Sequence, residues 1–197
     1  MAGHTEHPEA FPPRYLQTLR RQIHGSPYFT VNNLNRDFVG TRGFSIVFQR
    51  PQLARVVAEF PGFAPYLELV LDAECNAFYL NPLQLELGSR VDPHIDRSLR
   101  AYLDAIDPPL RVSVLYVDVP AAMQGGALVL QRGKRRLGKI TPRSNLLVYF
   151  EGDLTHSVER LDSPGQRLSL VCEQYRLTDE ELQHVPQYAI ESRVRRY

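Results

Sequence analysis

The sequence predicts an α+β fold that is mainly β, with a jelly-roll (double-stranded β-helix) core and supporting N-terminal helices. After Asn76, short segments rich in apolar residues follow one another, and turn signals such as Gly-Gly at 125–126 and Ser-Pro-Gly at 163–165 separate them. Many short strands at this spacing are typical of a sandwich or barrel. Before Asn76, apolar residues recur at three- and four-residue spacing, which indicates helices.

The expected elements can be given by residue range. Helices are expected over 14–24, after Pro51 and near Pro65, with one strand over 44–48. Strands are expected over 83–87, 111–119, 127–131, 137–140, 145–150, 155–160 and 167–176. A last helix is expected from Thr178, because Thr178 and Glu181 fit a capping box. We therefore expect a single domain over 1–197, with a flexible segment at 1–13 and a β core at 76–176.

Composition excludes several classes of protein. The formal net charge of +1 provides no bulk attraction for a polyanion, so no nucleic-acid partner is expected. No apolar stretch reaches the roughly 18–20 residues that a membrane-spanning helix needs, so no membrane association is expected. The two cysteines form no metal or redox motif, and a cytoplasmic location is the default interpretation. The oligomeric state cannot be predicted.

The segment from Val91 to Asp96 carries the first candidate site. His94 and Asp96 are two residues apart, and alternate residues of an extended chain point the same way. Together with one more histidine they would form the two-histidine, one-carboxylate triad that binds iron(II) and leaves positions open. His156 follows a turn and enters an expected strand, whereas the other histidines lie in the tail or in helical context: His4, His7, His24 and His184.

Arg167 follows His156 by eleven residues, across a turn, and Ser169 would face the same side of the returning strand. A guanidinium binds a carboxylate in a bidentate manner, so Arg167 beside a metal site would suit a dicarboxylate. A surface arginine on an edge strand is the alternative interpretation of Arg167 alone.

These motifs together resemble the 2-oxoglutarate- and iron(II)-dependent dioxygenase superfamily, especially its prolyl-4-hydroxylase-like branch. The resemblance covers about half the chain and includes His94-Ile95-Asp96, His156 and Arg167-Leu168-Ser169, with Gly125-Gly126-Ala127-Leu128 between them. It implies that His94, Asp96 and His156 bind Fe(II) and carry the catalysis. It also implies that Arg167 binds the distal carboxylate of 2-oxoglutarate and that O2 is the second cosubstrate.

Further assignments are implied only by the resemblance. Tyr116 matches a tyrosine that supports the distal carboxylate in the branch, although a core aromatic is an equal interpretation, and Ser169 is placed with the cosubstrate. The branch commonly has a tyrosine on the strand before His-x-Asp, where this chain has Leu85 to Gly88. That departure weakens the transfer of a prolyl substrate.

The implied function is hydroxylation of an unactivated carbon in a small-molecule or peptidyl substrate, with release of succinate and CO2. Retention of Asp96 favours hydroxylation over halogenation, and desaturation or cyclisation would use the same ligands. Arg90, Arg97 and Asn81 are candidates for substrate contacts, although charged residues of such a loop are more often simply solvated. The alternatives are a nucleic-acid demethylase and a non-catalytic metal-binding barrel.

Overall fold

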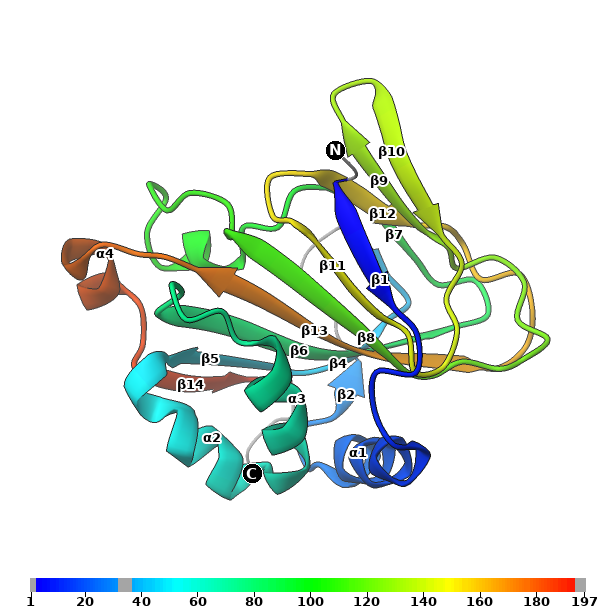
Figure 1. The fold of residues 1–197 in the computed structure, drawn as a ribbon, viewed down its shortest axis with the longest axis horizontal. Coiled ribbons are helices and arrows are strands. Elements are labelled where there is room, and N and C mark those ends of the chain that lie inside the picture. The colour runs from blue at the N-terminus through cyan, green and yellow to red at the C-terminus, as the bar shows by residue number, and fades with distance from the viewer. Residues whose placement is uncertain (1–2, 32–36, 194–197) are drawn as a thin grey trace.

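Two antiparallel β-sheets, with helices against one of them, make up the computed structural model, which describes residues 3–31 and 37–193 (Figure 1). The larger sheet has nine strands in the described residues. Its order is β1 (His4–His7), β11 (Leu147–Glu151), β8 (Arg111–Asp118), β13 (Gln166–Tyr175), β6 (Ala77–Glu86), β4 (Arg42–Gly43) and β2 (Thr30–Val31). Two further strands extend it beside β6, where β5 (Ser45–Gln49) pairs with β6 and with β14 (Tyr188–Glu191).

The smaller sheet has five strands in the part of the chain that the structure describes. Its order is β10 (Arg135–Ile140), β9 (Leu128–Arg132), β12 (Thr155–Val158), β7 (Arg90–His94) and β3 (Phe38–Val39). Apolar residues of both sheets form one cluster, which includes Leu85 and Val114 from the larger sheet and Leu130 and Val158 from the smaller one. The two sheets therefore pack against each other, and this mainly β double sheet confirms the predicted fold class.

Three helices cover the outer face of the larger sheet (Figure 1). They are α1 (Pro13–Gly25), α2 (Leu53–Glu59) and α3 (Ala64–Val70), with 3-10 turns η1 (Arg50–Gln52) and η2 (Pro61–Phe63) beside α2. Apolar residues of these helices, such as Leu19, Val56 and Leu67, pack with Phe78 and Leu170 of the sheet. In the described residues no helix is long and apolar enough to cross a membrane.

The C-terminal helix begins where the capping signal predicts. The helix α4 (Asp179–His184) follows Thr178, whose side chain accepts from the backbone N–H of Glu181. In return, the Glu181 carboxylate accepts from the backbone N–H of Thr178. This reciprocal pair satisfies two N–H groups that the first turn leaves without partners.

Of the segment 1–13, which was expected to be flexible, the structure describes residues 3–13, and several of these pair with the rest of the fold. Strand β1 pairs with β11, and the side-chain amide of Asn145 bonds both the N–H and the C=O of Phe11 at 2.9 and 2.7 Å. The polar sequence of β1 shows no hydrophobic pattern because backbone pairing, and not side-chain burial, holds it.

Strand β6 is longer and more buried than predicted. The alternation of Leu83 and Leu85 with Gln84 suggested a half-buried strand, but Gln84 is also buried and its carbonyl oxygen lies 3.0 Å from Nε2 of His24. The helical layer covers this second face of the sheet, so both faces of β6 are interior. The sheets also extend beyond the expected core of 76–176, because β1 to β5 and β14 lie outside that range.

Candidate active site

The two histidines of the predicted triad lie opposite each other in the smaller sheet. His94 ends β7, His156 lies in β12, and the antiparallel register pairs them directly. Asp96 follows His94 by two residues, just beyond the end of β7, and is buried, as is His156. The sheet register thus brings together two segments that are sixty residues apart in the sequence.

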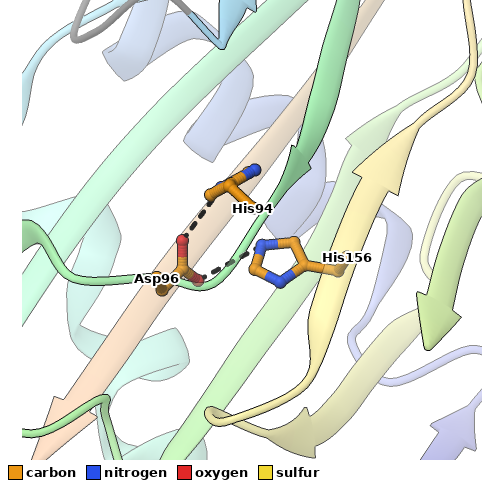
Figure 2. A group of neighbouring side chains, drawn as sticks. All are labelled: His94, Asp96 and His156. Carbon is orange, nitrogen blue, oxygen red and sulfur yellow. Dashed lines mark ion pairs between the residues drawn. The ribbon is translucent and has the colours of Figure 1, made fainter. Parts of the chain in front are cut away.

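The three side chains converge on one point (Figure 2). Nε2 of His94 lies 3.3 Å from Oδ1 of Asp96, and Nε2 of His156 lies 3.4 Å from Oδ2. Each residue offers one ligand atom, and these atoms all lie within 4.8 Å of one another. Two imidazole nitrogens and one carboxylate oxygen in this arrangement form the donor set of a facial iron(II) site.

Backbone carbonyls hold the other nitrogen of each ring. Nδ1 of His94 lies 2.8 Å from the carbonyl oxygen of Asp92, and Nδ1 of His156 lies 3.1 Å from that of Leu154. A carbonyl only accepts, so both Nδ1 atoms carry the proton and both Nε2 atoms keep a lone pair directed at the centre. Such bonds from outside the ligand set orient metal-binding histidines.

The electrostatics of the triad fit a cation. Burial lowers the pKa of His94, but the neighbouring Asp96 carboxylate outweighs it and leaves the pKa raised. Burial raises the pKa of Asp96, but the two imidazoles hold it well below its usual range. Nε2 of His94 is buried and, although it faces the Asp96 carboxylate, it makes no hydrogen bond, so it is available to coordinate a metal. The residues present therefore fit an iron(II) ion.

A cavity of about 460 Å³ contains the triad and extends between the two sheets. Apolar side chains form much of its wall, including Val112, Leu128 and Val158. The polar residues that line it include the triad itself and, from β13 and β8, Arg167, Ser169 and Tyr116. A largely apolar cavity with a few convergent polar groups is typical of a small-ligand site.

Arg167 is buried in this cavity, with only 2% of its surface exposed. Its guanidinium lies over the ring of Tyr116, 4.8 Å from the ring centroid, and Nη1 donates to the carbonyl oxygen of Gly126 at 2.6 Å. Nε of Arg167 and the hydroxyl of Tyr116 are buried without hydrogen-bond partners. Two unpartnered donors beside a buried positive charge fit a carboxylate.

Gly126 makes the anchor of Arg167 possible. Its φ of +70° is in the left-handed region, and a Cβ there would lie 2.5 Å from Cδ1 of Leu161. Only glycine takes up this backbone conformation in so small a space. The Gly-Gly signal at 125–126, seen in the sequence as a turn, therefore also places the carbonyl that orients Arg167.

The remaining candidates from the sequence occupy different surroundings. Ser169 lines the cavity, and its hydroxyl donates to the carbonyl of Leu83 at 3.3 Å. Asn81 and Arg97 also line the cavity, and the Asn81 amide donates to Phe44 and Ser45. Arg90 does not line it: its guanidinium lies on the surface, 2.8 Å from Asp92. The solvated alternative therefore describes Arg90 best.

Sequence reasoning missed Glu173, which lines the cavity from β13 and is only 3% exposed. Burial first, and then the charge of Asp96, raise the pKa of Glu173 to about 8. Its position was detectable, since Glu173 is six residues after Arg167 and even spacing along a strand places both on one face. Glu191, from the unpredicted strand β14, lines the same cavity and had no such signal.

Comparisons with known proteins found similarity in structure but not in sequence. No family model matches the sequence, and no curated protein matches it significantly. Among solved structures, the fold is similar to a prolyl-4-hydroxylase from Pseudomonas putida, with a TM-score of 0.58 and 21% identity, over 90% of this chain and 95% of that one.

Two other solved structures extend the likeness. A prolyl hydroxylase from Trichoplax adhaerens, in complex with a peptide fragment of the oxygen degradation domain of hypoxia inducible factor, aligns at a TM-score of 0.61 and 13% identity, over 92% of this chain and 86% of that one. HygX from Streptomyces hygroscopicus, with nickel and 2-oxoglutarate bound, aligns at a TM-score of 0.56 and 16% identity, over 88% of this chain and 83% of that one. These likenesses confirm the predicted resemblance at the level of the fold, which is that of 2-oxoglutarate- and iron(II)-dependent oxygenases.

Proposed function

We propose that this protein is a 2-oxoglutarate- and Fe(II)-dependent dioxygenase that hydroxylates an unactivated carbon of a small-molecule or peptidyl substrate and releases succinate and CO2. One observation carries the proposal: a single cavity joins the triad of His94, Asp96 and His156 to the unpartnered donors of Arg167 and Tyr116. A metal site alone would fit many functions, but a metal site with a buried carboxylate anchor fits a dicarboxylate cosubstrate.

In this proposal the triad holds iron through Nε2 of both histidines and a carboxylate oxygen of Asp96. The backbone bonds to Nδ1 fix both rings before the metal arrives, which reduces the ordering that binding requires. When bound, iron(II) supplies the activation of O2 that is coupled to decarboxylation of 2-oxoglutarate. A retained Asp96 occupies the third protein position and favours hydroxylation.

Arg167 and Tyr116 would bind the distal carboxylate of 2-oxoglutarate. The bond from Nη1 to Gly126 and the Tyr116 ring beneath the guanidinium fix the orientation of Arg167. The Tyr116 hydroxyl supplies a second donor, and burial raises the pKa of this tyrosine, so the hydroxyl keeps its proton. The apolar wall around them excludes water, which strengthens the pairing of opposite charges.

The substrate range draws on the proteins with similar folds. Two of them are prolyl hydroxylases, one in complex with a peptide, and this supports a peptidyl substrate as one possibility within the proposed class. HygX, with 2-oxoglutarate bound, shares the same fold outside the prolyl hydroxylases. The cavity of about 460 Å³ suits 2-oxoglutarate together with a small group of a substrate.

Binding and turnover together test the proposal. Purified protein reconstituted with Fe(II) in the absence of oxygen is expected to bind 2-oxoglutarate by isothermal titration calorimetry. On admission of O2 it is expected to form succinate, and the His94→Ala and His156→Ala proteins are expected to lose this activity. A folded, iron-loaded protein that binds no 2-oxoglutarate would contradict the proposal.

A further inference from the structure

A buried carboxylate lies in the cavity beyond the groups that the proposed chemistry uses. Glu173 is on the same face of β13 as Arg167 and Ser169, because the three residues alternate along one strand. The O–H and N–H of Ser98 donate to its carboxylate at 2.5 and 3.3 Å, and the Tyr175 hydroxyl donates to it as well. These bonds hold the carboxylate at the cavity wall.

This end of the cavity is separate from the Arg167 end and adjacent to the triad. Six residues of extended strand between Arg167 and Glu173 span about 20 Å, so a ligand as short as 2-oxoglutarate does not contact both. Ser98, which bonds Glu173, follows the metal-binding candidate Asp96 by two residues. A group bound at Glu173 would therefore lie next to the reacting centre.

Glu173 lacks a positive partner within the described part of the chain. Among these residues no lysine, arginine or histidine lies within ion-pairing distance of its carboxylate, although hydroxyl and amide donors satisfy it. A buried carboxylate without a counter-charge is unfavourable, so it either keeps a proton, as the raised pKa of Glu173 indicates, or pairs with a cation. Glu191 lines the same cavity and accepts a hydrogen bond from Tyr102.

The charges in the cavity with iron(II) and 2-oxoglutarate bound also favour a cation beside Glu173. The two positive charges of iron(II) and the one of Arg167 balance the charge of Asp96 and the two charges of 2-oxoglutarate. Apart from the groups just counted, the wall of the cavity includes the acids Glu173 and Glu191 and the base Arg97. A cation bound there would favour the ionised form of Glu173 and would leave two acids against one base, so this part of the cavity favours a positively charged group.

Independently of the acids, a ligand is indicated at the opposite end of this cavity, which the proposed function assigns to 2-oxoglutarate. The hydroxyl of Tyr116 and Nε of Arg167 line it, belong to side chains that are more than nine-tenths buried, and have no partners. We infer that the substrate of the proposed dioxygenase carries a cationic group, a primary amine or guanidinium, which binds Glu173, with Glu191 as a second acidic contact. This inference rests on the proposed function and names its substrate class.

The test compares matched pairs of probes that differ in charge. Protein loaded with Mn(II) and 2-oxoglutarate, without oxygen, is titrated by calorimetry with two pairs of probes: L-arginine and its neutral analogue L-citrulline, and L-lysine and its neutral analogue L-norleucine. Agmatine is titrated as a further cationic probe. The cationic member of each pair is expected to bind at least tenfold more tightly. Glu173→Gln, which keeps the shape and one of the two acceptor oxygens, is expected to abolish the preference. Glu191→Gln is expected to reduce it.

Glu68→Gln provides the matched control, because Glu68 is an exposed acid on α3 outside the cavity. The Glu68→Gln protein is expected to prefer cationic probes as strongly as the unsubstituted protein does. The inference would be overturned by equal binding within the pairs, by tighter binding of the neutral members, or by no binding of any cationic probe. If the protein still bound 2-oxoglutarate in these cases, the proposed function would stand. Loss of 2-oxoglutarate binding by the unsubstituted protein would overturn both. If Glu173→Gln does not fold, the matched pairs on the unsubstituted and Glu191→Gln proteins decide the question.

Discussion

His94 and His156 form a directly opposed pair across β7 and β12, with their ring centroids 4.4 Å apart. The backbone hydrogen bonds between these two strands therefore set the separation of the two rings, which does not depend on a flexible loop. A site built on paired strands is held more precisely than one built on loops. Asp96 alone lies beyond a strand end, where Ser98 and Glu173 tie down the segment that follows it.

Loss of either histidine is expected to remove metal binding without unfolding the protein. His94→Ala removes one of three ligand atoms, so the affinity for Fe(II) or Mn(II) is expected to fall by more than the roughly 100-fold that loss of an outer hydrogen bond costs. Equilibrium dialysis measures this directly. His184→Ala, which changes an exposed histidine of α4, is the control and is expected to bind metal normally. Equal affinities for the two variants would exclude His94 as a ligand.

Arg167→Lys is expected to weaken 2-oxoglutarate binding about 10- to 100-fold while metal affinity stays unchanged. Lysine keeps the positive charge but loses the planar pair of donors, and a hydrogen bond between charged groups is worth about 1.5–3 kcal/mol. Calorimetric titration of the Mn(II)-loaded protein measures the change. Arg160→Lys, at an arginine with 65% of its side chain exposed, serves as the control. Unchanged affinity in Arg167→Lys would place the distal carboxylate elsewhere.

The sheet strands of the second half were predictable because their sequence pattern and their burial agree. Strand β8 and strand β13 were expected within one or two residues of their observed ends, as was the capped helix at Thr178. Strands β1 and β14 were not predictable, since both are short strands joined to the sheet through backbone pairing. Local sequence carries little information about a strand that long-range pairing stabilises.

The metal site was more predictable than the pocket around it. His94 and Asp96 show a fixed spacing, and Arg167 and Ser169 show another, so each pair could be found by inspection. The position of Glu173 in the cavity depends on its contact with Ser98, which is 75 positions away in the sequence, and no local pattern encodes such a contact. Arg90 shows the opposite case, because it is close to the triad in sequence but is not among the residues that line the cavity.

Gly126→Ala is expected to destabilise the protein more than Gly133→Ala. Both glycines have positive φ, of +70° and +59°, and this conformation costs a residue with a Cβ about 1–2 kcal/mol. A Cβ at Gly133 meets nothing within 4 Å, whereas a Cβ at Gly126 meets Leu161, which adds about 1–3 kcal/mol of overpacking. Urea denaturation measures both free energies of unfolding. Equal losses would show that the space around Gly126 adjusts freely.

Glu173 is expected to make the metal-free protein less stable as pH rises. Its pKa is about 8 in the folded state against an ordinary value of 4.5, so between these values the folded state binds more protons than the unfolded chain. The free energy of unfolding therefore falls with rising pH across this window, by up to about 1.4 kcal/mol per pH unit. Glu173→Gln cannot titrate and is expected to flatten this slope.

Urea denaturation at several pH values between about 5 and 8 measures the slopes of the unsubstituted, Glu173→Gln and Glu68→Gln proteins. Glu68 is exposed, so its substitution is expected to leave the slope as it is in the unsubstituted protein. A cation bound beside Glu173 would favour the ionised carboxylate, so the unsubstituted slope is also expected to become shallower with agmatine present. Parallel slopes for all three proteins would show that the Glu173 carboxylate is already compensated without a ligand.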